Sequence, residues 1–397
     1  MSFKIPQKAS GSVSSEIRIV LERGRDIPDF ISLAIGNPAK EAIPVDKISE
    51  AAAAIMEAYP MEILQYGPAT GCTELKEWII NRMSEKKNMP SKNHSVLITN
   101  GSSQVLGLVA RCFTETGDEV YAEAFSYPNA LNAIRCSGAV VKGIAMDEKG
   151  MIPSELEKAA QSGKGRYIYI NPTFQNPTGF TMPLDRRKEI YEVAKKYDLL
   201  ILEDDPYEEI RFKGEPVPSF KSIDDAGIVL YAGSFSKTLS AGLRVGFVYG
   251  DQKYIDAMAS VKGCMDGEIA QYTQKIVHYA VSHMDYEEHL KDIQKIYGDK
   301  CNAMREILLS ECSKKVKLSN PDGGMFIWAE LPKDTDMDLF AEKLYEHAVG
   351  AVRSSAFSSI PSIPGTAFRL NYTALPTDKI IEGAKRFAAV TRELCGD

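Results

Sequence analysis

Short apolar runs alternate with amphipathic stretches through much of the chain. The runs are rich in Val, Ile, Leu and Tyr, a composition that favours strands buried on both faces. Segment 184–197 is typical of what lies between them, because Ile190, Val193 and Ala194 recur there at helical spacing. The alternation predicts an α/β fold with a mostly parallel seven-stranded sheet flanked by helices. Its strands are expected near residues 95–99, 119–122, 139–144, 166–170, 199–202, 228–232 and 244–248.

The spacing also shows where the sheet should depart from a parallel arrangement. Too few residues separate the runs at 228–232 and 244–248 for a parallel crossover, so one strand should be antiparallel. A long helical stretch at about 269–309 then precedes a strand-like run at 323–331. A chain of 397 residues suits two domains that share one site, and this last run predicts a smaller α+β domain.

The segment Ser234-Phe235-Ser236-Lys237, continuing to Arg244, joins the last two predicted strands. A lysine in such a loop is partly desolvated, which lowers its pKa and supplies the neutral amine that forms a Schiff base. The two serines and Arg244 offer hydroxyls and a guanidinium fork that suit a phosphate monoester. A Schiff-base lysine beside phosphate ligands points to pyridoxal phosphate. A surface lysine in a serine-rich turn would show the same short motif.

Two other strand ends carry side chains that this cofactor requires. Asp204 and Tyr207 follow the strand at 199–202, where a carboxylate can keep the ring nitrogen protonated and a tyrosine can donate to the phenolate oxygen. Asn176 lies in a rigid Asn-Pro loop after the strand at 166–170 and can reach the same oxygen. The structural alternatives are an acidic helix-capping turn for Asp204 and a plain turn for Asn176.

Small residues separate the strand at 95–99 from a helix that follows it. Ser102 and Ser103 lie at this helix start, where free backbone N–H groups and the positive end of the helix dipole suit a phosphate. An ordinary N-cap is the alternative, and the two roles are compatible.

Composition argues against several classes of partner. A net charge of −7 without a basic run disfavours nucleic acid and anionic membranes. No stretch approaches the ~20 apolar residues of a membrane span. Seven scattered cysteines and a polar N-terminus fit reduced thiols in a cytoplasmic protein. Five histidines show no metal-ligand spacing, so no metal is expected.

In chain order these motifs resemble those of the fold-type I pyridoxal-phosphate enzymes, the class I/II aminotransferases. The matches are N-P-T-G at 176–179, D-x-x-Y at 204–207, S-x-S-K at 234–237 and a late arginine, Arg369. Gly323-Gly324-Met325-Phe326 resembles the 2-aminoadipate/kynurenine branch. The resemblance implies a broadly specific aminotransferase that moves an amino group between an L-amino acid and a 2-oxo acid, with 2-oxoglutarate as the expected acceptor.

The resemblance also implies a role for each matching residue. Lys237 is expected to form the Schiff base and move the proton, assisted by Asp204 and Tyr207. Arg369 is expected to bind the substrate's α-carboxylate, beside the backbone of Gly36; an internal salt bridge is the alternative for a buried arginine. The implied cofactor ligands are Ser102, Ser103, Tyr127, Asn176, Asp204, Tyr207, Ser234, Ser236, Lys237 and Arg244, with Tyr66 reaching the phosphate of a neighbouring subunit.

By the same resemblance, residues 46–275 form the cofactor-binding domain, and residues 1–45 with 276–397 form a domain that closes on the substrate, in a homodimer. Ser15-Glu16-Ile17-Arg18 resembles a lid, so Arg18 is expected to pair with a distal substrate carboxylate and to swing away for an apolar side chain. A solvated arginine on an amphipathic helix is the alternative. Arg353 lies where the family has a Pro-Gly-Gly-like loop, and it is a second candidate anion contact.

Two other functions are compatible with the same cofactor fold. A pyridoxal-phosphate-dependent C–S β-lyase is one, because the reaction depends on how the substrate's bonds align with the ring. A transcription regulator with an aminotransferase-like domain is the other. It would need a basic helix-turn-helix extension, which the short segment ahead of Ile31 disfavours.

Overall fold

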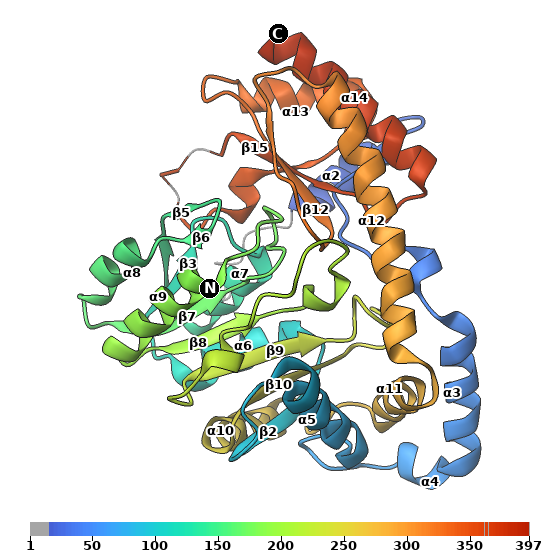
Figure 1. The fold of residues 1–397 in the computed structure, drawn as a ribbon, viewed down its shortest axis with the longest axis vertical. Helices are drawn as coiled ribbons and strands as arrows, with labels where there is room; N and C mark the ends of the chain where they lie inside the picture. The colour runs from blue at the N-terminus through green and yellow to red at the C-terminus, as the bar shows by residue number, and fades with distance from the viewer. Residues whose placement is uncertain (1–15, 361, 364, 397) are drawn as a thin grey trace, which may run out of the picture.

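The computed structural model describes residues 16–360, 362–363 and 365–396, and a seven-stranded sheet lies at its centre (Figure 1). The strand order is β2-β10-β9-β8-β7-β3-β4. Neighbouring strands are parallel except β10, which is antiparallel to β2 and to β9. The predicted α/β fold with one antiparallel strand is therefore confirmed. The strands are β2 (His94–Asn100), β3 (Glu119–Glu123), β4 (Val140–Ile144), β7 (Gly165–Ile170), β8 (Leu200–Asp204), β9 (Val229–Ser234) and β10 (Val245–Asp251).

Helices cover both faces of this sheet, so its strands read as continuous apolar runs. Successive strand residues point to opposite faces. Tyr169 therefore packs toward α6 (Ser102–Phe113), α7 (Pro128–Ser137) and α10 (Gln252–Met265). Ile168 packs on the opposite side. The helices of that side are α8 (Pro153–Ala160) and α9 (Leu184–Lys196), and, nearer β2, α3 (Val45–Ala58), α5 (Thr73–Lys87) and α11 (Gln271–His283).

The helical stretch predicted at 269–309 is broken into two helices. α11 ends at His283, and α12 (Tyr286–Glu311) begins after Asp285. The Asp285 carboxylate accepts a hydrogen bond from the backbone N–H of Glu288 at 3.0 Å. An acidic N-cap satisfies a donor that a helix start leaves free, so a new helix begins here instead of the old one continuing.

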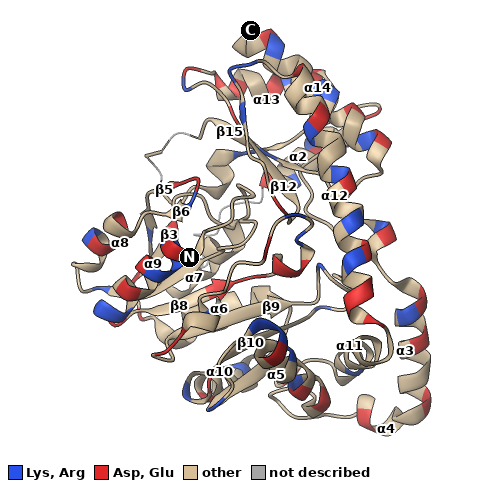
Figure 2. Ribbon diagram, in the orientation of Figure 1, with Lys and Arg blue, Asp and Glu red and all other residues tan. Residues whose placement is uncertain are grey.

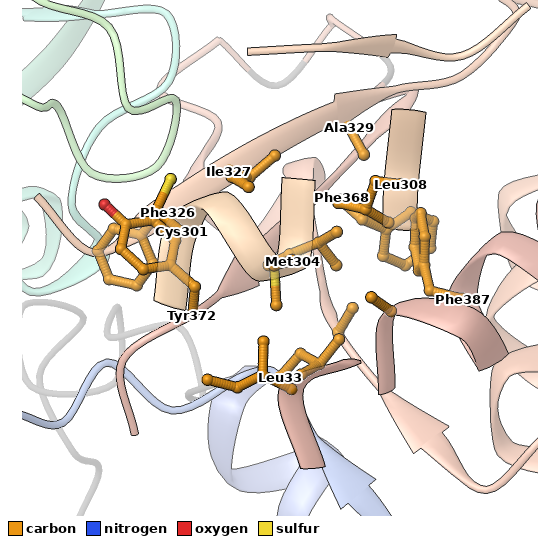
Figure 3. Packing of buried hydrophobic residues seen from close by; sticks show 14 of the residues in the cluster. Leu33, Cys301, Met304, Leu308, Phe326, Ile327, Ala329, Phe368, Tyr372 and Phe387 are labelled. Carbon is orange, nitrogen blue, oxygen red and sulfur yellow. The ribbon is translucent and has the colours of Figure 1, made fainter. Parts of the chain in front are cut away.

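A second, four-stranded sheet of order β11-β12-β15-β14 packs against α12 (Figure 1). Its strands are β11 (Lys317–Leu318), β12 (Phe326–Glu330), β14 (Val352–Arg353) and β15 (Ala367–Asn371), and the helices beside it are α13 (Met337–Glu346) and α14 (Thr377–Cys395). Figure 3 shows Met304 and Leu308 of α12 in one apolar cluster with Phe368 of β15 and Phe387 of α14.

Leu33, from the N-terminal segment, lies in the same cluster (Figure 3). It follows β1 (Ile31–Ser32), which pairs in parallel with β13 (Val349–Gly350). This packing is consistent with the domain limits of 46–275, and of 1–45 with 276–397, which stay a prediction.

Charged residues of both signs are interspersed along α12 and α14 (Figure 2). This is the pattern of helices that bury one stripe and leave the other in water. None of the helices described is both long enough and apolar enough to cross a bilayer. The remaining short elements include α2 (Glu16–Gly24), α4 (Pro60–Ile63), the hairpin β5 (Met146–Asp147) and β6 (Gly150–Met151), and the 3-10 turn η2 (Glu208–Ile210).

Candidate active site

A cavity of about 270 Å³ lies where β7, β8 and β9 end, beside the start of α6. The carboxyl ends of parallel strands are where α/β sheets bind ligands. Every predicted site residue except Tyr66, Arg18 and Arg353 lines this cavity. These residues are Gly36, Ser102, Ser103, Tyr127, Asn176, Asp204, Tyr207, Ser234, Ser236, Lys237, Arg244 and Arg369.

Lys237 enters the cavity from the loop between β9 and β10, as predicted. Its Nζ donates to the backbone carbonyl of Gly36 at 2.8 Å. Burial lowers the pKa of Lys237 to about 8, and the cations Arg369 and Arg244 act in the same direction. About a tenth of such an amine is neutral at pH 7, and the neutral form is the one that a nucleophile or base requires.

Asp204 is a buried carboxylate with one oxygen unused. Its Oδ2 accepts from the Tyr169 hydroxyl at 2.9 Å, while Oδ1 is buried and has no hydrogen-bond partner in the structure described. Burial raises the pKa of Asp204 to about 6, although the Tyr169 hydrogen bond opposes the rise. A protonated ring nitrogen would satisfy Oδ1 and offset the cost of burying the charge.

Asn176 and Arg369 are joined inside the cavity. Asn176 Oδ1 accepts from Arg369 Nη1 at 2.8 Å, which leaves the Asn176 Nδ2 group as a donor. Tyr207 is also a donor, because burial raises the pKa of its hydroxyl and keeps it protonated. Two donors on one side of the cavity suit a phenolate oxygen.

Arg369 is buried without an acidic partner among the residues described. Its Nη2 donates to the backbone carbonyl of Ala34 at 2.6 Å, and its Nε is unsatisfied. The guanidinium lies 4.2 Å from the ring centroid of Phe326 and 4.9 Å from that of Phe357. Burial lowers the pKa of Arg369 to about 10. Such a cation gains stability from an anion in the cavity, so the alternative of an internal salt bridge is not what this structure contains.

A separate group of donors lines the end of the cavity at the start of α6. A Cβ on Gly246 would lie 2.6 Å from Ser102 N, so only glycine lets β10 approach this helix start so closely. Ser234 Oγ donates to Ser236 Oγ at 3.0 Å, and Arg244 Nη1 lies 3.5 Å from Ser236 Oγ. Hydroxyls, a helix N-terminus and a guanidinium together suit a phosphate dianion.

The donor set therefore fits pyridoxal phosphate. Asp204 offers an unpartnered carboxylate oxygen for the ring nitrogen, Lys237 offers an amine, and the Arg244 end offers phosphate ligands. Among the described residues, no group of three or more His, Cys, Asp or Glu side chains could hold a metal ion.

Tyr66, Arg18 and Arg353 lie away from the cavity. Tyr66 is 90% exposed and lines a different surface hollow, beside Met61. The Arg18 side chain is 78% exposed and its Nε donates to Glu22 at 2.7 Å. Arg353 forms an ion pair with Asp338. Ser15, the first residue of the lid motif, lies outside the described residues.

Sequence reasoning missed several residues that complete the site. Tyr169 and Asn171 hold Asp204, the first through Oδ2 and the second by donating to its backbone carbonyl at 2.6 Å. Ile17 and Phe326 add apolar walls. A signal was present for Tyr169, since it is the penultimate residue of the strand beside that of Asp204, and alternation places both side chains on one face. Ile17 and Phe326 belong to motifs noted in the sequence, but nothing in those motifs predicted that these two side chains line the cavity.

A larger groove of about 1010 Å³ runs beside α12, but its chemistry is different. Arg82 is paired there with Glu209 and Glu287, and Lys87 with Glu208. Arg211 and Arg305 keep unpartnered guanidinium nitrogens, but no described carboxylate that lines the groove has a buried oxygen without a partner. The smaller cavity, with its unpaired Asp204 oxygen and Arg369, is therefore the candidate active site.

Comparison with known proteins agrees with this chemistry. The family model described as aminotransferase class I and II matches residues 28–387. The aromatic-amino-acid aminotransferase 1 of Thermococcus litoralis is 36% identical over 98% of this chain and 94% of its own. The 2-aminoadipate transaminase of Thermus thermophilus is 34% identical over 98% of this chain and 96% of its own.

A solved structure supports the same conclusion. The kynurenine aminotransferase of Pyrococcus horikoshii, in complex with PMP, superposes with a TM-score of 0.93 at 35% identity, covering 98% of this chain and 97% of that one. The fold, the cavity and these matches agree on the cofactor and on amino-group transfer. The chain is a pyridoxal-phosphate-dependent aminotransferase and belongs to the class I and II aminotransferase family.

Proposed function

We propose that Lys237, Asp204 and Tyr207 carry the catalytic chemistry. When bound, pyridoxal phosphate supplies an electron sink for the negative charge that develops at the substrate's Cα. Lys237 Nζ takes the Cα proton, for which its lowered pKa of about 8 suits it. Asp204 Oδ1 holds the proton on the ring nitrogen, and Tyr207 and Asn176 donate to the phenolate oxygen. The unpartnered Asp204 oxygen in the same cavity as Lys237 is the observation that carries the proposal.

Arg369 is proposed to bind the substrate's α-carboxylate. Its guanidinium is held by Asn176 and Ala34 and by contact with two rings, so its orientation is set before substrate arrives. A pre-oriented fork loses little side-chain entropy on binding. Because Asn176 touches both Arg369 and the phenolate site, substrate and cofactor are held by one connected set of hydrogen bonds.

We further propose 2-oxoglutarate as the usual amino acceptor. Glutamate, 2-aminoadipate and large neutral amino acids are the proposed donors. Support comes from the relatives, which are named for aromatic, aminoadipate and kynurenine substrates. The cavity wall near Arg369 offers apolar contact, since Ile17 lines the cavity and packs on the cluster that contains Trp328 and Phe357. Arg18 would serve an acidic side chain only after leaving Glu22.

An amino-acid panel tests this specificity. Ile17→Ala is expected to raise KM for large neutral donors by about tenfold, the scale on which lost methylenes weaken a hydrophobic pocket. Arg18→Ala is expected to raise KM for glutamate and 2-aminoadipate and to leave neutral donors unchanged. The panel measures kcat and KM for each donor with 2-oxoglutarate. If Arg18→Ala impairs neutral donors and spares acidic ones, the proposed role of Arg18 is wrong.

We propose a homodimer in which Tyr66 completes the partner's phosphate site. Tyr66 lies in a segment with an unusual density of exposed apolar side chains, and such patches mark interaction surfaces. The exposed residues in or beside this segment are Val45, Met56, Tyr59, Met61, Leu64 and Tyr66.

We also propose a cytoplasmic location. All seven cysteines are free thiols, which supports a reducing compartment.

Mixing two inactive variants tests the shared site. Tyr66→Ala and Lys237→Ala are each expected to have low activity, because each damages every site of a homodimer. A mixed dimer regains one intact site, which combines Lys237 of one subunit with Tyr66 of the other. Activity should therefore rise after the two are co-refolded, and light scattering should give a dimer mass. No rise in activity, or an active monomer, would refute the shared site.

A further inference from the structure

The Tyr286 hydroxyl links two loops of the active site from behind. It lies 2.9 Å from Thr238 Oγ1 and 3.3 Å from Glu209 Oε2. Thr238 directly follows Lys237. Glu209 lies in η2, a turn that begins at the residue after Tyr207. None of the three linking residues lines the cavity itself. One hydroxyl thus joins the segment that carries the amine to the segment that carries the phenolate donor.

This link is buried, and the direction of its hydrogen bond to Glu209 follows from the charge on Glu209. Tyr286 and Thr238 are almost completely buried, and the Tyr286 ring packs edge-on against Trp78 at 5.5 Å. Burial alone would raise the pKa of Glu209, but Lys87 and Arg82 outweigh it and hold the pKa below its usual value. Glu209 is therefore a carboxylate, which can only accept, so a hydroxyl must donate to it.

A second contact holds the same loop. Nε2 of His289, one turn further along α12, lies 2.7 Å from the backbone carbonyl of Thr238, so this nitrogen carries a hydrogen that it donates. Side chain and backbone of Thr238 are thus both tied to the first turn of α12. A loop restrained at two atoms beside its lysine has little freedom to move the amine.

The same helix also contacts the substrate side of the cavity. The Tyr297 hydroxyl accepts from the backbone N–H of Ala39 at 3.2 Å, and Lys300 Nζ donates to the carbonyl of Thr373 at 3.3 Å. Thr373 in turn donates to the carbonyl of Asn37, which lines the cavity. A single rigid helix therefore contacts both the lysine loop and the loop opposite.

We propose that Tyr286 is a positioning residue that fixes Lys237 relative to Tyr207 by joining their two loops through Thr238 and Glu209. The proposal rests on the assigned roles of Lys237 and Tyr207. Its consequence is that a group remote from the cavity sets how closely the amine and the phenolate donor approach the cofactor. Because both act on one conjugated system, their separation affects the protonation of the nitrogen that joins Lys237 to it.

Tyr286→Phe removes the hydroxyl and keeps the ring, so it tests this link with little change in packing. We expect kcat to fall about tenfold and KM to change less than about twofold, since misplacement of reacting groups lowers the rate more than binding. The pH at which the bound cofactor's visible absorbance changes should move by about half a unit. A merely structural tyrosine would alter thermal stability and leave this pH midpoint in place.

Three further variants provide the controls. Thr238→Val should reproduce the spectral shift, and Thr238→Ser, which keeps the hydroxyl, should behave as wild type. The double variant Tyr286→Phe/Thr238→Val should be no worse than Tyr286→Phe alone, because removal of the Tyr286 hydroxyl already breaks the bond that Thr238→Val removes. Tyr249→Phe, which removes a buried hydroxyl bound to the Pro90 carbonyl, should shift neither kcat nor the midpoint.

Two results would overturn the proposal. One is an unchanged midpoint and unchanged kcat in both Tyr286→Phe and Thr238→Val. The other is strict additivity of the two changes. Either result leaves the assignment of Lys237 intact, because that assignment depends on whether Lys237→Ala loses the cofactor's visible absorbance. Thr238→Val decides the question if Tyr286→Phe does not accumulate as a folded protein.

Discussion

Lys237→Ala is expected to remove the visible absorbance of the lysine-bound cofactor and to slow transamination by at least about 10⁴-fold. The expected loss is large because no other described amine lines the cavity, so no second group can take the Cα proton. Absorbance spectra and single-turnover rates of the purified holoenzyme measure the two effects separately. Spectra report on the covalent link, and rates report on proton transfer.

The controls distinguish chemistry from folding. Lys213→Ala removes an exposed lysine remote from the cavity and should leave both measurements unchanged. Adding a small primary amine to Lys237→Ala should restore part of the rate if the missing function is that of a base. A Lys237→Ala protein with wild-type turnover would contradict the assignment of this lysine.

Arg369→Met is expected to lower kcat/KM for amino acids by about 10²- to 10³-fold. The variant leaves the substrate's α-carboxylate without its partner, and loss of one partner of a buried, hydrogen-bonded charge pair costs about 2–5 kcal/mol. Methionine is long and apolar and retains contact with the rings of Phe326 and Phe357, so the cavity should not collapse. Arg369→Lys keeps the charge and loses the planar guanidinium fork, so its kcat/KM should lie between that of wild type and that of Arg369→Met.

The matched measurement uses an amine without the α-carboxylate. Wild type should strongly prefer the amino acid, and Arg369→Met should react with both about equally. Stability of the cofactor-free protein should not fall by the amount that a broken buried ion pair implies, since Arg369 has no acidic partner among the described residues. An equal loss of rate for the amine and the amino acid would instead indicate a structural role.

The chemical identity of the site was predictable because its parts lie at strand ends. Asp204 is the last residue of β8, and Lys237 follows β9. In a parallel sheet all carboxyl ends meet at one edge, so local patterns foretell that these side chains converge. The antiparallel β10 was predictable for a similar reason, because the link before it is too short for a crossover. Inferences of this kind require only local sequence patterns and the lengths of the links between strands.

Other features depend on contacts between distant segments. Arg369 and Asn176 are 193 residues apart, and nothing in either segment predicts that their side chains form a 2.8 Å hydrogen bond. The Tyr286 link to Thr238 spans 48 residues and two separate elements. Such pairings arise when helices and sheets pack, and residue type or period does not encode which side chains then meet.

The segment predicted to form a lid shows most clearly what sequence can and cannot determine. From its sequence, Arg18 was the natural candidate for a substrate contact, yet the structure turns Ile17 into the cavity and pairs Arg18 with Glu22. Successive helical residues point about 100° apart, so a motif identifies the helix without saying which of its side chains faces the site. By itself the sequence determined the fold class, the cofactor and the residues at the strand ends. The tertiary structure alone decided which side of each helix faces the cavity and which buried groups, such as Asp204 Oδ1 and Arg369 Nε, are left for a ligand.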